Sequence, residues 1–454
     1  MNNVKTLPNN CPEWLDGKNI NEPLFCQYFL QNHLILFSEN MFFTPEGCMA
    51  DEMTLKEMIF REIEPYACNS VPNKIKNIVD LLKIAAMVND FPPEEDRIHL
   101  KNGTLFLDGS FDPQSVYIVR SRIPVEYDSE APEPFYWKSF LDDLLYPEDI
   151  PTLQEFVGYC LLPTNKAQRM MIIKGNGGEG KSQIGTVLKA MFGINAKDGS
   201  VGKVSENNFA RADLEHIHLM IDDDMRMEAL KQTNYVKSLV TAKGKVDLER
   251  KKEQSYQGYM YARLLAFSNG DLQSLYDRSD GFYRRQLILT AKPKPYDRID
   301  DPDLAEKMCN ELNGILLWAF DGLKRLAANH FHFTESERSK GSRELLKQDA
   351  NNVILFMEAE DYIKLDGTSH TTSKELYACY CIWCEENGFT PLKARSVSDY
   401  LSTNADKYRI EHNNNTYNLD GRRVWGFKGI RLMIDTKLRS KEGFQRVTTE
   451  DLPF

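Results

Sequence analysis

The sequence predicts an α/β fold in which a parallel sheet carries helices, and three observations support this prediction. Residues 170–192 contain a short apolar run, a glycine-rich loop and then apolar residues at helical spacing. Three further apolar runs follow, at 218–221, 264–267 and 287–289, and each has polar or charged residues beside one end. Short buried runs of this kind are typical of parallel strands. The residues after the first run fit the pattern G-x4-G-K-[ST].

This glycine-rich loop, residues 175–182, is predicted to be a P-loop that binds ATP and Mg²⁺. Its glycines let backbone N–H groups turn around a phosphate, and the helix that follows adds partial positive charge. We expect Lys181 to reach the β- and γ-phosphates and Ser182 to place its hydroxyl on Mg²⁺. The predicted phosphate-binding residues are Gly175, Asn176, Gly177, Gly178, Glu179, Gly180, Lys181 and Ser182.

Composition limits the classes of protein that are compatible with this chain. Its 454 residues suffice for two to four domains, and a net charge of −11 argues against a protein that coats nucleic acid over its whole surface. No N-terminal signal and no apolar run of about 18 residues is present, so we expect a cytoplasmic protein without a membrane span. Cys379, Cys381 and Cys384 lie in one amphipathic stretch and are interpreted as thiols rather than zinc ligands, because structural zinc needs four.

Residues 1–134 are predicted to form an N-terminal domain, mixed α/β or mostly helical, that acts as a collar or binds a partner. Periodic apolar residues predict helices over 54–66 and 73–88, and alternation around Asp108-Gly109 predicts a hairpin. The acidic, proline-rich segment 124–134 is predicted to be a linker. Two helices within 135–162 then lead into the central domain, residues 135–335.

Polar residues beside the later strands complete the predicted site. The run 218–221 ends in three aspartates, of which Asp222 and Asp223 are predicted to hold Mg²⁺ with Ser182, and Asp224 is an alternative. Asn269 follows the run 264–267 and would position the attacking water if that strand lies between the other two. Arg284 and Arg285 precede the last strand; they form either ordinary ion pairs or fingers that reach the γ-phosphate of a neighbouring subunit.

A basic segment in this acidic protein predicts contact with nucleic acid. Its five cations lie within residues 243–252 together with only two carboxylates, Asp247 and Glu249. Gly244 and Gly258 bracket the segment, and its alternating ends suggest a projecting hairpin. A run of charge is usually a solvated face, but a positive excess favours contact with phosphates. The predicted DNA-binding residues are Lys243, Lys245, Arg250, Lys251 and Lys252.

The C-terminal region, residues 336–454, is predicted to be a winged-helix domain. The helices predicted within 303–330 close the central domain. In the C-terminal region, helices are predicted over 352–363, 373–388 and 396–401, followed by a hairpin over 409–419 and 423–427. Its tail is either a second DNA footprint or a solvated extension. The basic residues of this tail are Arg422, Arg423, Lys428, Arg431, Lys437, Arg439, Lys441 and Arg446.

Together these motifs resemble those of the superfamily-three-type replicative helicases of phages, plasmids, poxviruses and mobile genetic islands, from about residue 100 to about residue 430. The motifs that carry the resemblance are GNGGEGKS, KSLVTAKGKVDLERKK, FSNGDL, DGFYRR and LYACYCIWCEENG. The resemblance implies an AAA+ core in which Lys181, Asp222, Asp223 and Asn269 are catalytic and Arg284 or Arg285 acts in trans. It also implies that Lys251 and Lys252 lie near the tip of a DNA-contacting hairpin.

The function that the resemblance implies is an ATP-dependent replicative helicase, assembled as a ring, commonly a hexamer, that moves 3′ to 5′. Its expected partners are single-stranded, forked or origin DNA, further copies of the chain and other replication proteins. Many related ATPases have a Glu after the Mg²⁺-binding Asp, and this Glu activates the attacking water. This chain has Asp222, Asp223 and Asp224 instead, so the sequence does not identify which carboxylate activates the water. A second hypothesis is an origin-binding initiator in which ATP only changes the conformation of the protein. A third is an ATPase that remodels other proteins.

Overall fold

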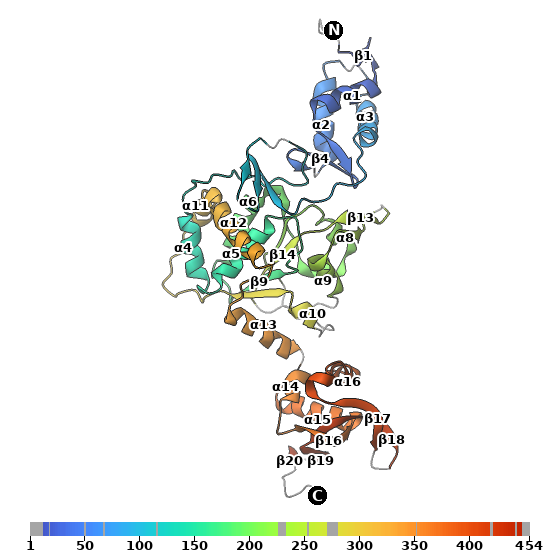
Figure 1. Ribbon diagram of the computed structural model, residues 1–454, viewed down its shortest axis with the longest axis vertical. Coiled ribbons are helices and arrows are strands. Elements are labelled where there is room, and N and C mark those ends of the chain that lie inside the picture. The colour runs from blue at the N-terminus through green and yellow to red at the C-terminus, as the bar shows by residue number, and fades with distance from the viewer. Residues whose placement is uncertain are drawn as a thin grey trace. The chain divides into compact units, whose positions relative to one another are not determined.

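The computed structural model divides into two compact units, residues 1–343 and 344–454 (Figure 1). None of the helices in the described residues is long and apolar enough to cross a membrane. The structure describes residues 12–17, 19–49, 51–66, 69–114, 117–225, 233–251, 254–269, 280–350, 352–417, 421–440 and 443–446.

A five-stranded parallel sheet forms the centre of the first unit and confirms the predicted α/β core. The strand order is β10-β11-β14-β9-β15, so β14 lies between β11 and β9, the order that the prediction for Asn269 required. Residues of the inner strands are almost all buried, as expected where helices cover a parallel sheet. The strands are β9 (Met170–Lys174), β10 (Ala196–Asp198), β11 (Leu219–Asp222), β14 (Arg263–Ser268) and β15 (Gln286–Thr290).

Helices pack on this sheet and share one hydrophobic core with it. Figure 1 shows α5 and α12 side by side. Glycines allow this approach: a Cβ at Gly158 would lie 2.3 Å from the carbonyl oxygen of Ala319, and one at Gly322 would lie 2.5 Å from that of Gln154. The helices of this unit that follow residue 134 are α4 (Phe135–Leu144), α5 (Ile150–Cys160), α6 (Lys181–Phe192), α7 (Val201–Glu206), α8 (Asn208–Ala212), α9 (Asn234–Thr241), α10 (Asp280–Tyr283), α11 (Leu304–Cys309) and α12 (Leu312–Ala328).

The N-terminal part of the unit contains the predicted helices and hairpin. The predicted linker differs from expectation: Val125 is buried in the central core, and a Cβ at Gly314 of α12 would lie 2.4 Å from the carbonyl oxygen of Pro132. The segment is therefore irregular but packed. The elements are β1 (Leu15–Asp16), β2 (Asn19–Ile20), α1 (Glu22–Asn32), β3 (Leu36–Ser38), β4 (Met41–Thr44), β5 (Gly47–Cys48), α2 (Glu52–Ile63), α3 (Val71–Ala85), β6 (Arg97–Leu100), β7 (Gly103–Phe106) and β8 (Phe111–Asp112).

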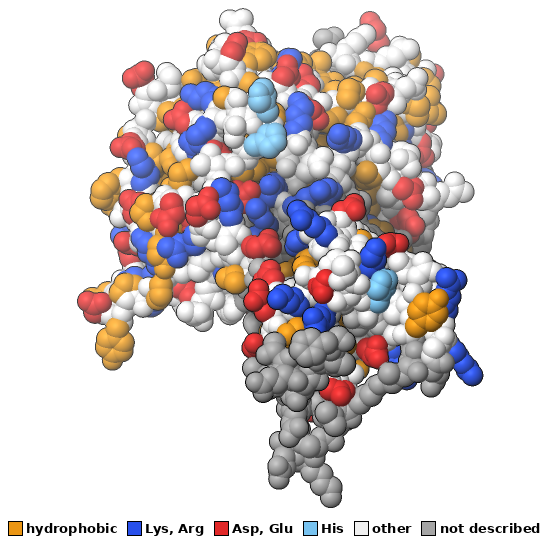
Figure 2. Space-filling model, turned by 60° about the horizontal axis from the view of Figure 1, so that its bottom comes forward, with side chains coloured by type: hydrophobic (Ala, Val, Ile, Leu, Met, Phe, Trp, Pro, Cys, Tyr) orange, Lys and Arg blue, Asp and Glu red, His pale blue; other side chains and the backbone are white. Residues whose placement is uncertain are grey.

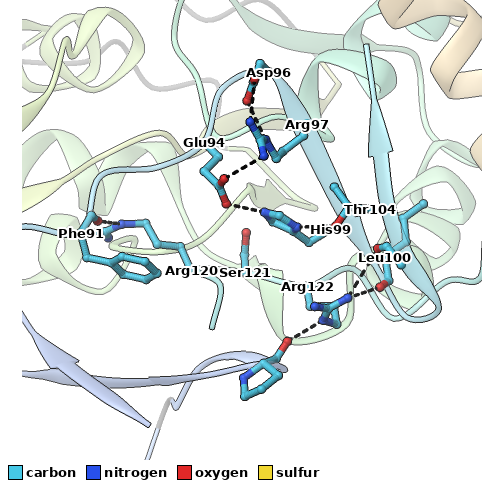
Figure 3. Close-up of polar contacts among 12 residues, drawn as sticks. Phe91, Glu94, Asp96, Arg97, His99, Leu100, Thr104, Arg120, Ser121 and Arg122 are labelled. Atoms are coloured by element: carbon cyan, nitrogen blue, oxygen red, sulfur yellow. Dashed lines mark hydrogen bonds and ion pairs between the residues drawn. The ribbon is translucent and has the colours of Figure 1, made fainter. Parts of the chain in front are cut away.

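Two arginines connect this N-terminal part to the rest of the unit (Figure 3). Arg120 donates to the carbonyl oxygen of Phe91 and pairs with Glu39 at 2.7 Å, and both side chains of the pair are at most 5% exposed. Arg122 donates to the carbonyl oxygens of Pro45 and Leu100. These contacts fix the β3–β5 strands against the segment that leads into the central sheet.

Arg120→Ala is expected to destabilise the unit strongly, because it leaves the Glu39 carboxylate buried without its main cation. Breaking one side of a buried pair costs about 3–5 kcal/mol. The matched control is Arg61→Ala, whose pair with Glu57 is 75% and 60% exposed, and which should cost under about 1 kcal/mol. Denaturant unfolding followed by circular dichroism measures both values; equal losses in the two variants would contradict the account.

The second unit contains a three-stranded antiparallel sheet in the order β16-β18-β17, with helices packed on it. The helix predicted over 352–363 is too long: α14 ends at Met357, and a strand that the sequence analysis missed begins at Ile363. The elements are α14 (Val353–Met357), β16 (Ile363–Thr372), α15 (Ser373–Glu386), α16 (Ala394–Thr403), α17 (Ala405–Tyr408), β17 (Glu411–Tyr417), β18 (Arg423–Leu432), β19 (Ile434–Ser440) and β20 (Gly443–Arg446); α13 (Glu337–Ala350) crosses the division between the units.

Candidate functional site

The carboxyl ends of β9, β11 and β14 meet at one edge of the central sheet, where a cavity of about 700 Å³ opens. The 175–182 loop follows β9, Asp223 and Asp224 follow β11, and Asn269 follows β14; all of these line the cavity except for Gly175 and Asn176 of the loop. This is the edge at which open parallel sheets bind ligands. The structure therefore brings together most of the residues that the sequence analysis predicted for phosphate and magnesium.

The loop needs its glycines. Gly177, Gly178 and Gly180 have φ angles of +102°, +80° and +105°, which residues with a Cβ rarely adopt. At Gly175 the constraint is space, because a Cβ there would lie 2.7 Å from Lys181 Nζ and 2.8 Å from Glu179 Cδ. The loop is thus wrapped closely around two of its own charged side chains.

Those side chains form a buried ion pair inside the loop. Lys181 Nζ donates to Glu179 Oε2 at 2.8 Å, and the two residues are 7% and 2% exposed. The Glu179 carboxylate also accepts hydrogen bonds from the backbone N–H groups of Asn176 and Gly177. Burial opposes ionisation of Glu179, but the bonds from Lys181 and the backbone outweigh it and hold the pKa of the carboxyl below its usual range. Lys181 Nζ also lies 3.5 Å from Asn269 Oδ1.

Arg298 binds the same loop through its carbonyl groups, and the sequence analysis missed it. Its guanidinium donates to the carbonyl oxygens of Glu179 at 2.9 Å and Gly178 at 3.1 Å. In a trans peptide the C=O and the following N–H point in opposite directions. Holding these two carbonyls therefore turns the N–H groups of Glu179 and Gly180 away from Arg298, into the arrangement that cradles an anion. Arg298 stands in an irregular segment after β15, where no periodic pattern marks it.

Of the three aspartates after β11, Asp223 and Asp224 line the cavity, whereas Asp222, which the sequence analysis predicted to hold Mg²⁺, does not. Asp222 is 5% exposed, accepts the N–H of Val201 at 2.7 Å and does not line the cavity, whereas Asp223 and Asp224 are exposed and do. Burial raises the pKa of Asp222. Ser182, Asp223 and Asp224 line the cavity next to the loop, and Asp143, Asp300 and Asp301 line it from other segments. Hydroxyl and carboxylate oxygens suit Mg²⁺, so the donor set fits the ion that the sequence analysis expected.

Asp222→Asn is expected to raise the melting temperature at neutral pH. The raised pKa means that the charged carboxylate is disfavoured in the fold, so wild-type stability falls as pH rises from the usual aspartate range through the raised value. Asparagine does not titrate, and its oxygen still accepts the Val201 N–H. Thermal melts across this pH range should show the gain growing with pH; a loss of equal size at every pH would contradict the assignment.

The rest of the cavity wall mixes apolar and charged residues. Tyr136, Phe140 and Leu144 of α4 line it together with Asp143, and Ile299 and Leu304 line it from the chain after β15 together with Asp300 and Asp301. Aromatic and aliphatic side chains beside the loop offer a surface for the base of a nucleotide whose phosphates the loop would hold.

Arg284 and Arg285 do not reach this cavity. They precede β15, whose first residue, Gln286, pairs with Met170 at the start of β9, whereas the loop follows the end of β9. Five strand residues, about 16 Å, separate the two edges. The arginines line a separate groove with Lys166, Arg169, His330 and His332, and Glu335 pairs with Arg169 there. Figure 2 shows Lys and Arg side chains gathered across the face turned to the viewer, with Asp and Glu among them.

The basic segment forms the predicted hairpin, with β12 (Lys245–Leu248) antiparallel to β13 (Tyr256–Tyr259). Its cations fall into two groups. Lys245 pairs with Asp90 at 2.9 Å and with Glu39 at 3.2 Å, and Arg250 pairs with Glu215 at 2.8 Å. Lys243 and Lys251 are exposed, and Lys252 lies outside the described residues. The paired cations hold both ends of the hairpin, Lys245 at its open end and Arg250 in the connection after β12, whereas Lys243 and Lys251 face solvent.

Glu39, Glu215 and His216 approach one another as metal ligands would, but their chemistry argues against a metal. Arg120 donates to His216 Nδ1 at 3.1 Å, and burial holds the pKa of His216 well below its usual value. The neutral ring therefore carries its hydrogen on Nε2, which is then a donor and not a ligand. With Lys245 and Arg250 also present, the cluster is an ion-pair network.

Comparison with known proteins finds partial family matches and a shared fold. Residues 173–285 match a family of unknown function, DUF5906, and residues 348–425 match the family described as poxvirus D5 protein-like. An apo structure of the NrS-1 C-terminal region has a TM-score of 0.52 at 12% identity, covering 90% of this chain and 100% of that one. The A form has a TM-score of 0.51 at 11% identity, covering 89% and 99%. No curated protein matches the chain.

Proposed function

We propose that this protein is an ATP-dependent DNA helicase that serves replication of a phage or mobile element. The observation that carries the proposal is the 175–182 loop: Arg298 holds two of its carbonyls, Lys181 lies 3.5 Å from Asn269, and Asp223 and Asp224 line the same cavity. The match to the poxvirus D5 protein-like family and the fold shared with the NrS-1 C-terminal region support the assignment to viral replication.

In this proposal ATP binds in the cavity at the carboxyl edge of the sheet. Its phosphates take the N–H groups of Gly178 to Ser182 and the ammonium of Lys181, and Mg²⁺ lies on Ser182, Asp223 and Asp224. The base lies against Tyr136 and Phe140. Asn269 holds the attacking water, with Asp223 or Asp224 as the activating base.

The second half of the active site comes from a neighbouring subunit. Because Arg284 and Arg285 lie at the opposite edge of the sheet, they can serve an ATP only in another copy of the chain. A head-to-tail contact closes into a ring where the rotation between copies permits it, and a hexamer is the ring that the resemblance implies. Arg284 is the better finger because it is exposed, whereas Arg285 donates to the carbonyl oxygen of Gly281.

Mixing two inactive variants tests the shared site. Lys181→Ala removes the lysine that would bind the phosphates but keeps Arg284. Arg284→Ala keeps that lysine but removes the arginine offered to the neighbouring copy. Each variant alone should therefore lose ATP hydrolysis. In an equal mixture about a quarter of the head-to-tail interfaces combine an intact Lys181 with an intact Arg284, so about a quarter of wild-type activity should return. A mixture as inactive as its components would rule out a finger acting in trans.

DNA is gripped by the β12–β13 hairpin in this proposal, through the exposed Lys243 and Lys251 together with Lys252. Replacing Lys243 and Lys251 by Ala should spare nucleotide binding and reduce the slope of log affinity for single-stranded DNA against log salt by about 1.4, since each phosphate contact on a single strand contributes about 0.7. Fluorescence anisotropy at several salt concentrations measures this slope. Lys324→Ala, an exposed α12 lysine paired with Asp321, is the control; an unchanged slope in the double variant would remove the hairpin from the DNA path.

The second unit is interpreted as a winged-helix module, since its strand order β16-β18-β17 with three intervening helices has that topology. A rival function, an origin-binding initiator that ATP only switches, would use the same module to hold one duplex sequence. Strand displacement on a forked duplex with ATP separates the two: unwinding supports the helicase, and sequence-specific retention without unwinding supports the initiator.

A further inference from the structure

Two exposed aromatic side chains stand at one end of the sheet in the second unit. Trp425 on β18 and Tyr417 on β17 are 58% and 60% exposed. Tyr417 lies directly opposite Arg423 in the antiparallel register, so their side chains share a face. Trp425 follows Arg423 by two residues and therefore lies on the same face as well. The three side chains form an aromatic–cation–aromatic group, called here the wing platform.

The structure beneath Trp425 is fixed. Its ring lies 5.0 Å from that of His412, which in turn stacks on the buried Phe427 at 4.3 Å. His412 also contacts the hydroxyls of Ser402 on α16 and Ser373 on α15. One side of the indole is thus held by a ring tied to two helices, while more than half of the residue faces solvent.

The backbone of this region is equally constrained. A Cβ at Gly426 would lie 2.4 Å from Thr416 Oγ1 and 2.5 Å from the carbonyl oxygen of Thr371, so the three strands are in close contact beside Trp425. A preorganised surface loses little conformational entropy when a ligand binds to it. The exposed rings are therefore presented in a defined position and not on a freely moving loop.

The charge around the wing platform selects an anionic ligand. Arg423 lies on the face of the two rings, and residues 421–432 contain no carboxylate. Arg422 and Lys428 alternate onto the other face of β18, where Lys428 lies opposite Glu411 in the register. This composition contrasts with the net charge of −11 of the whole chain.

A ligand that needs flat apolar surfaces and cations together is a nucleic acid with exposed bases. We propose that Tyr417, Arg423 and Trp425 bind single-stranded DNA, with unpaired bases stacked on the two rings and a phosphate on the guanidinium. Paired bases in a duplex hide their faces, so the wing platform discriminates single strands from duplexes and reads no sequence. This inference depends on the proposed function only for the class of ligand, and it names a contact separate from the β12–β13 hairpin.

The test is binding of a fluorescent oligothymidylate and of a blunt duplex of equal length to the full chain, followed by anisotropy. Trp425→Ala and Tyr417→Ala should each weaken single-strand binding about tenfold and leave duplex binding within about twofold, because stacking on one aromatic ring supplies about 1–3 kcal/mol per base. Trp425→Phe should restore most of the loss. Leu365→Ala, a 45% exposed residue on β16 of the same sheet, is the matched control and should change neither.

Melting temperatures verify that each variant folds; if Trp425→Ala melts early, Tyr417→Ala carries the test. Unchanged single-strand affinity, or an equal loss for single strands and duplex, overturns the proposal. Basal ATP hydrolysis without DNA separates this result from the proposed function: the platform variants should retain it, and Lys181→Ala should not. If Lys181→Ala retained hydrolysis, the motor assignment would fail while the binding result would still decide the wing platform.

Discussion

The candidate site depends on how charge is balanced around the 175–182 loop. Glu179 accepts hydrogen bonds from Lys181 and from two backbone N–H groups inside the loop. Arg298 donates hydrogen bonds to two carbonyl oxygens of the loop backbone. The loop is therefore fixed by contacts with both its N–H and its C=O groups. A bound phosphate would compete with Glu179 for Lys181 but would leave the contacts of Arg298 intact. Nucleotide binding would then change one ion pair without rebuilding the loop.

The central sheet separates this loop from the arginines that would complete it. One edge carries the loop, Asp223, Asp224 and Asn269, and the opposite edge carries the basic groove that contains Arg284. One copy of the chain therefore does not bring Arg284 to its own loop. The β12–β13 hairpin, tied by Lys245 and Arg250 to Glu39 and Glu215, lies in the same unit.

Much of this arrangement was predictable from local patterns. The glycines of the loop, the apolar strands and the alternating ends of the basic hairpin between Gly244 and Gly258 each have a signature in sequence, and the structure contains these elements. Arg298 had no such signature, since its role arises only when an irregular segment folds against carbonyls more than a hundred residues away. The sequence also could not show which aspartates line the cavity. The structure shows that Asp222 turns inward, because its carboxylate accepts the N–H of Val201. The strand β16 was also missed, because mostly polar residues follow Ile363 and the sequence there shows little alternation of apolar and polar residues.

A structure of the assembled protein with a non-hydrolysable ATP analogue and Mg²⁺ tests the central claim most directly. The account predicts triphosphate density within the 175–182 loop and Lys181 Nζ moved from Glu179 to the phosphates. It also predicts Arg298 still on the carbonyls of Gly178 and Glu179, and Arg284 of a neighbouring copy at the γ-phosphate. Nucleotide bound elsewhere, or at this loop with no arginine from another copy within reach, would contradict it.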